Sequence, residues 1–340
     1  MFRSPTFYGA LAVYGYTGIV LLACGLMWVA GDRWWVATLI LFGPRWVVGI
    51  PLVALVPLAL AVRPRWLWPL GLSAVVVLWP IMGLRLPWRT LADPLHADLR
   101  VMTYNIDQCR VDEQSFAELL EVLQPDLVAV QECPWWARWR VPDHWHVERA
   151  GELLVISAHP IVDVEVSRSQ PSQWRGSYVN GLYCVVETPV GRIGFANVHL
   201  ETPRHGLSAV LDRDRLVDLE QADYADARIQ ARRLDSEAMA RWLASFPEPK
   251  IIAGDFNMPV ESTIYREFWQ GYENAFNRAG LGFGYSKQTA IRNRVYGTRI
   301  DHILTDAHWR AIRSHLGPDL GSDHLPLVAD VRRELEDGTW

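Results

Sequence analysis

The chain has 340 residues, of which 50% are hydrophobic and 21% are charged, with 17 tryptophans and a net charge of −5. This composition excludes a disordered chain, a collagen-like repeat and a small disulfide scaffold. The charge is unevenly divided: residues 1–95 hold seven arginines and two acidic residues, a net of +5, which leaves a net of −10 for the remainder. The acidic second part disfavours nonspecific binding of nucleic acid.

Three apolar segments in the first ninety residues predict transmembrane helices. Each lacks charged residues and is near the roughly 20 residues that a helix needs to cross a bilayer, and tryptophans gather at the ends, as in interfacial aromatic belts. We therefore predict a multi-pass membrane domain over residues 1–90 in the cell (inner) membrane, with helices at about 7–31, 46–62 and 66–84. The short piece Trp34–Pro44 is either a re-entrant segment or an extension of the second span.

The orientation of these helices is only weakly encoded, because the arginines divide almost evenly between the two sides, and Arg85 and Arg89 oppose the orientation chosen here. A short amino terminus with Arg3 and no acidic residue favours an inside location for that end. Three crossings then place the rest of the chain outside the cytoplasm.

After a linker at residues 91–98, the pattern changes to alternating strands and helices, which predicts an α/β (α+β) domain over residues 99–334. Strands are predicted at 99–104, 126–131, 153–157, 183–187, 192–199, 250–253, 299–304 and 327–331. Helices are predicted at 113–123, 211–246 and 261–269. In the long helix, Leu234, Ala238 and Trp242 recur every four residues and predict its buried face.

Polar residues stand where several of these strands end. Asn105 and Asp107 follow the first strand, Glu132 follows the second, and His199 ends another. Each is weak evidence alone, because such residues commonly form turns. Strand ends can nevertheless converge on one rim of a sheet, where active sites are often built.

Taken in order, these residues form a set of motifs: Thr-Tyr-Asn-Ile-Asp (103–107), Val-Gln-Glu (130–132), Asn-Val-His-Leu (197–200), Gly-Asp-Phe-Asn (254–257), Ile-Asp-His-Ile (300–303) and Ser-Asp-His-Leu-Pro (322–326). The set resembles the endonuclease/exonuclease/phosphatase (DNase-I-like) superfamily over residues 99–332. Within it, the chain looks similar to membrane-anchored bacterial members of the teicoplanin-resistance type. The resemblance implies a four-layer α/β sandwich with two packed β-sheets, here preceded by the three predicted transmembrane helices.

The resemblance also implies roles for individual residues. Glu132, Asp107 and Asp323 are expected to bind Mg²⁺ or Mn²⁺, because carboxylates are hard oxygen ligands. Asp255 resembles the residue that orients or deprotonates the attacking water, and Asp301 would support His324. The remaining catalytic candidates are Asn105, Asn257 and His199, and the tentative phosphate contacts are Arg204 and Arg175, with Lys287 considered beside them.

These residues predict a membrane-anchored, divalent-metal-dependent phosphoester hydrolase that uses an activated water for in-line attack, with the lipid bilayer and a phosphate ester, possibly lipid-linked, as its partners. The first alternative is a membrane-tethered nuclease, which the acidic charge balance disfavours without excluding. The second is a non-catalytic membrane scaffold, which is disfavoured because every charged or amide position needed for the chemistry is present.

Overall fold

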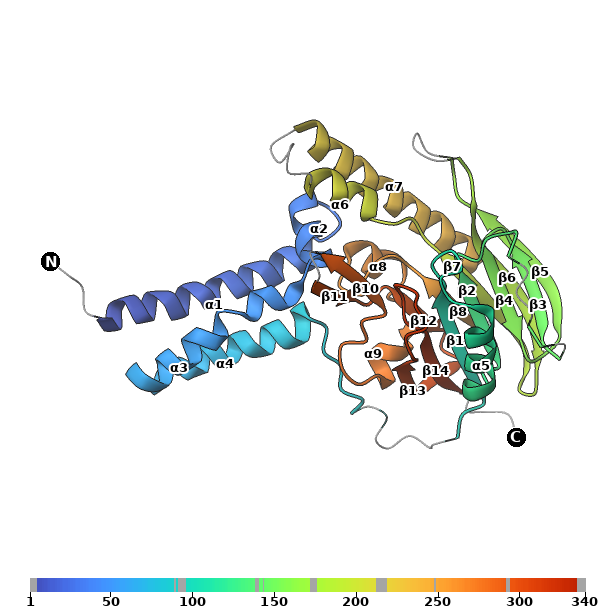
Figure 1. The fold of residues 1–340 in the computed structure, drawn as a ribbon, viewed down its shortest axis with the longest axis horizontal. Coiled ribbons are helices and arrows are strands. Elements are labelled where there is room, and N and C mark those ends of the chain that lie inside the picture. The colour runs from blue at the N-terminus through green and yellow to red at the C-terminus, as the bar shows by residue number, and fades with distance from the viewer. Residues whose placement is uncertain are drawn as a thin grey trace.

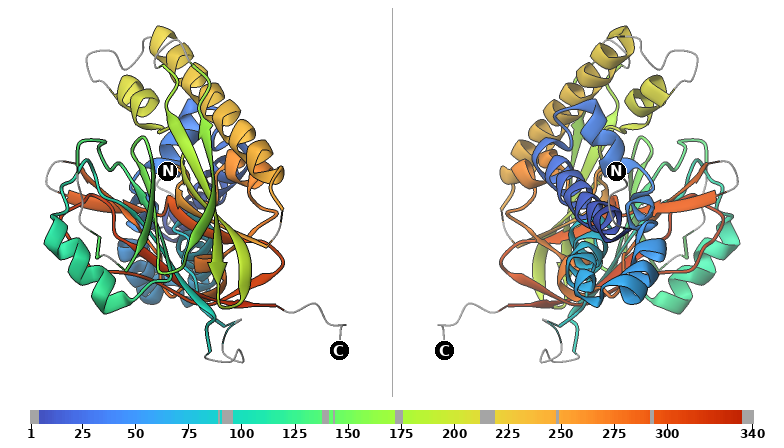
Figure 2. Two further views of the ribbon diagram at one scale, coloured as in Figure 1. Left: turned by 90° about the vertical axis from the view of Figure 1, so that its right-hand side faces the viewer. Right: turned by 90° about the vertical axis from the view of Figure 1, so that its left-hand side faces the viewer.

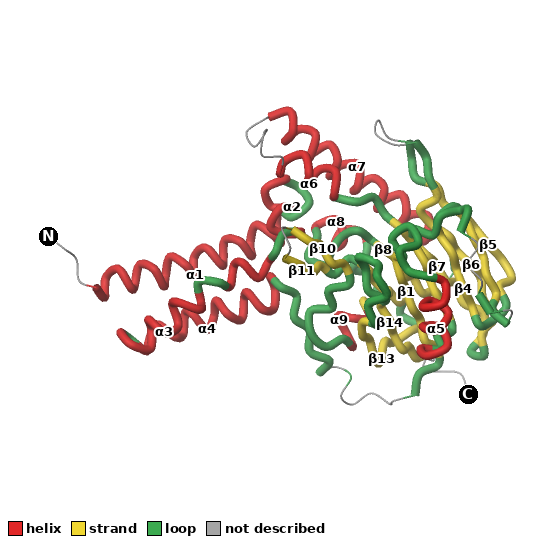
Figure 3. Tube along the Cα trace, in the orientation of Figure 1, coloured by secondary structure: helices red, strands yellow, loops and turns green. Residues whose placement is uncertain are grey.

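The computed structural model describes residues 5–334, except for 89, 91–95, 138–140, 143, 172–175, 212–218, 248 and 292–293. The first part of the chain forms a group of helices, and the rest forms a sandwich of two β-sheets (Figures 1 and 3). The first group consists of α1 (Pro5–Ala30), α2 (Trp35–Phe42), η1 (Arg45–Gly49), α3 (Leu52–Val62), η2 (Pro64–Trp66), α4 (Leu67–Val76) and the π-helical turn η3 (Val77–Ile81). Helices α1, α3 and α4 pack together, as the end-on view of Figure 2 shows, and project away from the sandwich (Figure 1).

Two helices among the described residues, not three, are long and apolar enough to cross a membrane. They are Thr6–Ala30, with 25 residues, and Arg45–Val62, with 18 residues. The predicted third span at 66–84 is therefore wrong as an independent transmembrane helix. In the structure, α4 has ten residues and passes into a five-residue π-helical turn that contains Pro80. Proline lacks an amide hydrogen, and the helical region ends before Gly83, whose φ of +79° suits glycine.

The sandwich contains two mixed six-stranded sheets. In spatial order, the first sheet is β13 (Trp309–Leu316), β14 (Leu327–Arg333), β1 (Leu99–Asn105), β2 (Leu127–Gln131), β4 (Leu153–Ser157) and β3 (His146–Ala150). The second is β5 (Ile161–Arg168), β6 (Val179–Thr188), β7 (Gly191–His199), β8 (Lys250–Asp255), β12 (Asp301–Thr305) and β9 (Glu273–Asn274). A separate hairpin pairs β10 (Lys287–Ile291) with β11 (Arg294–Thr298).

All eight strands that the sequence predicts occupy the centres of the two sheets. The sequence pattern did not predict the four edge strands, β13, β3, β5 and β9, or the β10–β11 hairpin. Edge strands are exposed along one side and give a weak hydrophobic pattern, as the largely exposed β5 shows. Central strands such as β8 are buried along their whole length and read as continuous apolar runs.

Helices cover both outer faces of the sandwich, giving the four layers that were expected. α5 (Glu113–Leu123) packs on the first sheet. α7 (Leu219–Ala244) and α8 (Thr263–Phe268) pack on the second, and α6 (Arg204–Leu211) precedes α7. The short α9 (Ala275–Ala279) contributes to the apolar layer between the sheets.

The predicted buried face of the long helix is wrong for Leu234 and Ala238, whereas Trp242 is partly buried and packs against the core. Leu234 is 60% exposed, whereas Arg232 on the opposite face is 1% exposed. The reversal has a physical reason, because the buried polar side chains have partners: Arg232 pairs with Asp32, and Ser236 accepts a hydrogen bond from Trp269. A helix face that carries arginine and serine is thus buried once the rest of the fold supplies their partners.

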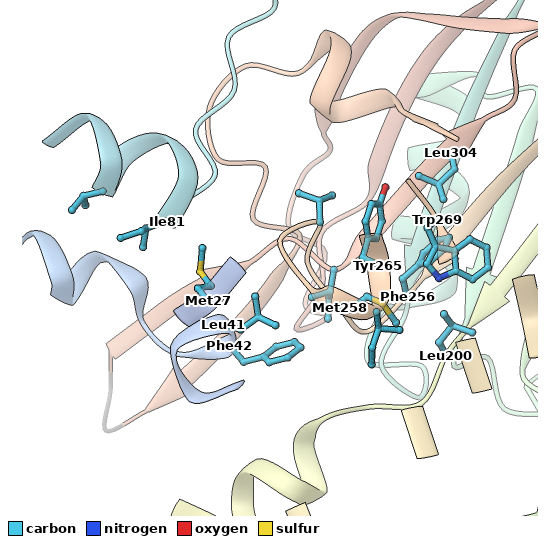
Figure 4. Packing of buried hydrophobic residues seen from close by; sticks show 14 of the residues in the cluster. Met27, Leu41, Phe42, Ile81, Leu200, Phe256, Met258, Tyr265, Trp269 and Leu304 are labelled. Atoms are coloured by element: carbon cyan, nitrogen blue, oxygen red, sulfur yellow. The ribbon is translucent and has the colours of Figure 1, made fainter. Parts of the chain in front are cut away.

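The helical group and the sandwich share one hydrophobic cluster. Met27, Leu41 and Phe42 from the helices lie near Met258 and Tyr265 of the sandwich (Figure 4). The ambiguous segment 34–44 forms α2, which packs against α6 and α7, and Gly43–Pro44 separates it from η1. It is therefore a separate helix and not an extension of the next one. The helices are docked on the sandwich as well as joined to it through the chain.

Candidate active site

The strand register brings together residues that are far apart in the sequence. In the second sheet, His199 of β7 and Asp301 of β12 both stand opposite Asp255 of β8. In the first sheet, Asn105 ends β1, and Glu132 directly follows its neighbour β2. Both sheets therefore contribute polar side chains to the same end of the sandwich.

A buried histidine links three of these positions. His324 Nδ1 lies 2.9 Å from Asp301 Oδ2, and His324 Nε2 lies 3.7 Å from Asp255 Oδ2. Burial lowers the pKa of His324, but the charges of the two carboxylates raise it by more than burial lowers it, so the net shift is upward. The pKa of Asp255 is raised by its burial and by the charge of Asp301, while that of Asp301 is lowered because His324 outweighs the burial.

An amide connects the two sheets at this site. Asn105 Nδ2 donates to Glu132 Oε1 at 3.0 Å and to Asp255 Oδ2 at 3.1 Å. His199 Nε2 lies 3.8 Å from both of these carboxylate oxygens. Burial raises the pKa of Glu132, but His199 and the Asn105 amide lower it more, so its carboxylate is favoured in the ionised form.

Three of the predicted residues have left-handed backbone conformations. Asp107, Glu132 and Asn257 have φ values of 45°, 55° and 52°, a region that costs residues other than glycine about 1–3 kcal/mol each. The turn after β8 is held by hydrogen bonds, because the Asn257 amide donates to Asp255 Oδ1 and its side chain donates to the Leu200 carbonyl. Backbone strain therefore concentrates where the polar side chains meet.

The other predicted residues lie near the rim or outside the described chain. Asp107 pairs with Arg110 at 3.0 Å, and Asp323 forms an ion pair with Lys287. Arg204 lies 3.8 Å from Asp323. Arg175 lies outside the described residues.

The buried group fits a divalent metal. Asp255, Asp301 and His324 each offer a ligand atom, and these atoms lie within 4.8 Å of one another. Glu132 adjoins the group through Asn105. Its oxygens accept hydrogen bonds from the side-chain amides of Asn105 and Gln108, and these neutral amides leave the charge of the carboxylate for a cation. The donor set is mainly carboxylate, which suits a hard cation such as Mg²⁺ or Mn²⁺.

Several residues that support the site were missed from the sequence. Ser322 donates to the Asn105 carbonyl and accepts from the His324 amide, and Ser286 accepts from the Asp301 amide. Arg232 donates to the Asn257 carbonyl at 3.0 Å. Ser322 belongs to the Ser-Asp-His motif and could have been found there, whereas no local pattern marks Ser286 or Arg232.

Comparisons with known proteins agree with this architecture. The sequence model of the endonuclease/exonuclease/phosphatase family matches residues 102–324. No curated protein matches the chain. The narrower resemblance to membrane-anchored, teicoplanin-resistance-type proteins finds no support among the comparisons.

Solved structures with a similar fold include three examples. An endonuclease/exonuclease/phosphatase from Beutenbergia cavernae is 17% identical, with a TM-score of 0.51 over 70% of this chain and 72% of that chain. One from Bacteroides vulgatus is 15% identical, with a TM-score of 0.51 over 70% and 100%. D. rerio TDP2 complexed with a single-strand DNA product is 14% identical, with a TM-score of 0.50 over 69% and 98%. These identities show a common fold alone.

Proposed function

This chain belongs to the endonuclease/exonuclease/phosphatase family, and we propose that it is a membrane-anchored, divalent-metal-dependent phosphoester hydrolase. One observation carries the proposal. His324 lies between the carboxylates of Asp301 and Asp255, and Asn105 ties Asp255 to Glu132. Such a cluster can activate a water molecule and stabilise charge that develops on a phosphoryl group.

The side chains divide the work of in-line hydrolysis. Asp255 orients or deprotonates the attacking water, and its raised pKa moves it toward the range of a useful base. His324, held by Asp301, stabilises negative charge or gives a proton to the leaving oxygen. His199 lines the same space, and Asn257 has one amide hydrogen left after its bond to the Leu200 carbonyl, which can be donated to the phosphoryl group.

A divalent ion, Mg²⁺ or Mn²⁺, is the proposed cofactor. Glu132 would offer it a ligand beside the buried Asp255–Asp301–His324 group, whose side chains keep the roles given above. Asp107 and Asp323 are further candidates, and each of them would exchange its present partner, Arg110 or Lys287, for the ion. When bound, the ion would polarise the phosphoryl oxygens and neutralise their charge.

The apolar helices support attachment to a membrane. Only 28% of the apolar window in Thr6–Ala30 and 11% of that in Arg45–Val62 is buried, unlike a core helix of a soluble protein. Large hydrophobic side chains face outward, including Leu11 at 62% and Val53 at 79% exposure. An apolar exterior of this extent needs a cover, and lipid is the cover that matches its length.

The arrangement of the helices also favours a catalytic domain outside the cytoplasm. α1 begins at the end of the helical group that is distant from the sandwich and ends beside the sandwich (Figure 1). The shorter α4–η3 segment, which packs against α1, brings the chain back to the sandwich, so the amino end and the catalytic domain lie on opposite sides of any bilayer that surrounds α1. An amino-terminal segment with Arg3 and no acidic residue favours the inside for that end.

The function is tested on the full chain in lipid nanodiscs. The protein is loaded with Mg²⁺ or Mn²⁺ and offered phosphomonoesters, phosphodiesters, a pyrophosphate and single-stranded DNA. We expect hydrolysis of a small phosphate ester, complete loss of activity in excess EDTA, and recovery when the ion is restored. Undiminished turnover after confirmed removal of metal would contradict the mechanism, preference for DNA would favour a nuclease, and inactivity on every ester would favour a scaffold.

A further inference from the structure

A groove of about 730 Å³ lies beside the candidate catalytic residues. Asn257 and Asp323 line it where it meets the active site. The volume falls in the range of sites that hold small molecules. The groove is thus continuous with the place where a phosphoryl group would react, and its other lining residues describe the rest of the substrate.

One part of the lining is apolar and comes partly from outside the family domain. Leu39 and Phe42 of α2 and the following Pro44 contribute to it, together with Leu207 of α6 and Ile300. These residues offer neither charge nor a hydrogen bond from their side chains. They suit a hydrocarbon chain rather than a sugar, a nucleobase or a peptide backbone.

The apolar wall is held rigidly against the turn after β8 that carries Asn257, here called the catalytic turn. The Arg232 guanidinium lies 5.2 Å from the centre of the Phe42 ring. The same arginine pairs with Asp32 at 2.8 Å and donates to the carbonyl of Asn257. The segment that follows α1 and the catalytic turn are therefore fixed to one another, so the groove does not depend on a flexible linker.

Another part of the lining is cationic. Lys287 pairs with Asp323, Arg204 lies 3.8 Å from the same carboxylate, and Arg110 pairs with Asp107. The wall that carries Lys287 is tied to the candidate active site, because Lys287 forms a β-bridge with His324. Cations beside the reacting position match the negative charge of a phosphate ester.

From this juxtaposition we infer that the groove binds the hydrocarbon chain of an amphiphilic phosphate ester while the phosphoryl group lies among Asp255, His324 and the cations. This inference rests on the proposed hydrolase function and names its substrate class. The position of α2 supports it: this charge-free helix begins shortly after α1 ends and lines the groove with its last turn.

The test is the dependence of kcat/KM on chain length, measured with the full chain in nanodiscs. Alkyl phosphates and their methyl diesters with four to ten carbons are supplied below the concentrations at which they form micelles. Each methylene that becomes buried is worth up to about fourfold, so we expect decyl phosphate to exceed butyl phosphate by roughly 50-fold or more. In Leu39→Gln on α2 and Leu207→Gln on α6, both of which line the groove, this ratio should fall at least fivefold.

Leu234→Gln is the matched control, because Leu234 is exposed on α7 and does not line the groove. It should keep the wild-type ratio. A ratio that falls in the groove variants but not in this control arises at the groove, because partitioning of the long esters into lipid would act equally on every variant. The ratio of kcat/KM values for each variant does not depend on the fraction of folded protein. Two groove variants are used so that the test still stands if one of them fails to fold.

The outcomes separate the substrate class from the chemistry. Hydrolysis that is independent of chain length, or a ratio that changes equally in the control, overturns this inference and leaves the hydrolase proposal standing. Failure to hydrolyse any ester overturns the hydrolase proposal and this inference with it. A parallel arm with phosphatidic acid in the nanodisc assigns the source: its turnover indicates a membrane lipid, and turnover of the monomeric esters alone indicates an amphiphile taken from water.

Discussion

The N-terminal helices and the catalytic sandwich place charge in opposite ways. The helices expose apolar side chains such as Val53, and the flanking charges Asp32 and Arg45 are only 3% and 7% exposed. The sandwich has an apolar interior, and most of its charged residues are at least partly exposed, apart from those of the site and the junction. This difference is the one that the proposed membrane attachment requires, with lipid around the helices and water around the sandwich.

The two regions meet through buried ion pairs. Asp32 pairs with Arg232 at 2.8 Å, and Arg45 pairs with Glu261 at 3.0 Å, with every one of these side chains at most 5% exposed. Each pair joins a residue of the helical part to one near the catalytic turn or on the helix that covers it. The contrast between the regions can be tested by disturbing the site, the junction, the lipid-facing surface and the titration of the core in turn.

The largest expected effect is confined to the chemistry of the sandwich. Asp255→Ala should lower kcat by about 10²–10⁴, because it removes the residue proposed to activate water. Nanodisc incorporation should stay near wild type, since the hydrogen-bond partners of this carboxylate belong to the sandwich. Asp163→Ala, at an exposed aspartate of edge strand β5, is the control and should retain full turnover. Near-normal kcat in Asp255→Ala would refute the site assignment.

Most of the sandwich and its site could be predicted from the sequence, whereas the junction with the helices could not. The central strands and the residues at their ends were predicted because complete burial leaves continuous apolar runs, and the motifs occur in family order. The edge strands were missed because half of their surroundings is water. Arg232 was assigned to the wrong face of its helix because its partner Asp32 is 200 positions away, and no local pattern records such a pairing.

The third span was over-predicted for a related reason. Composition counts apolar residues, whereas crossing a membrane requires an uninterrupted helix. In that segment the ten-residue α4 passes into a π-helical turn that contains Pro80, and the helix ends before the left-handed Gly83. Breaking the junction is therefore the next way to examine how the two regions depend on each other.

Arg232→Met should destabilise the protein by about 3–5 kcal/mol, because it leaves Asp32 buried without its cation. The unfolding free energy of the sandwich in nanodiscs measures this. The double variant Asp32→Leu/Arg232→Met should recover most of the loss, since neither charge remains buried. On the same helix, Arg241→Met is the control: Arg241 is 74% exposed, pairs with Glu237, and should cost at most about 0.5 kcal/mol. Equal costs for the two single variants would mean that the junction is not sealed from water.

A lysine substitution on the exterior of each region tests whether that exterior is in contact with lipid or with water. Val53→Lys should cost about 2.5–3.5 kcal/mol of membrane insertion, because Val53 is 79% exposed on α3, where lipid is proposed to surround it. Leu234→Lys, at a 60% exposed position of α7, should stay within about 0.5 kcal/mol. The readout is the fraction of protein that resists carbonate extraction from membranes. If the two lysines are tolerated equally, the helices are not in contact with lipid.

The smallest expected effect concerns pH and belongs to the sandwich alone, because the first histidine of the chain is His96. His302 is fully buried; Asn274 Nδ2 lies 3.1 Å from its Nδ1, and the Met258 carbonyl lies 2.9 Å from its Nε2. An amide donor at one nitrogen and a carbonyl acceptor at the other fix the neutral ring. Burial, the largest cause, lowers the pKa of His302 to about 4.

Because the pKa of His302 is lower in the folded state, the folded protein should lose stability as the pH falls. Above the unfolded pKa of about 6.5, both states are neutral and the full stability is present. As the pH falls below that value, the unfolded state binds the proton first, so stability should drop by about 2 kcal/mol between pH 7 and pH 5 and level off below about pH 4. His302→Gln removes the titrating ring and should flatten this part of the stability curve of the sandwich, whatever its effect at neutral pH. His96→Gln, at an exposed position, should leave the slope unchanged. An acid slope that survives His302→Gln would place the titration at another group.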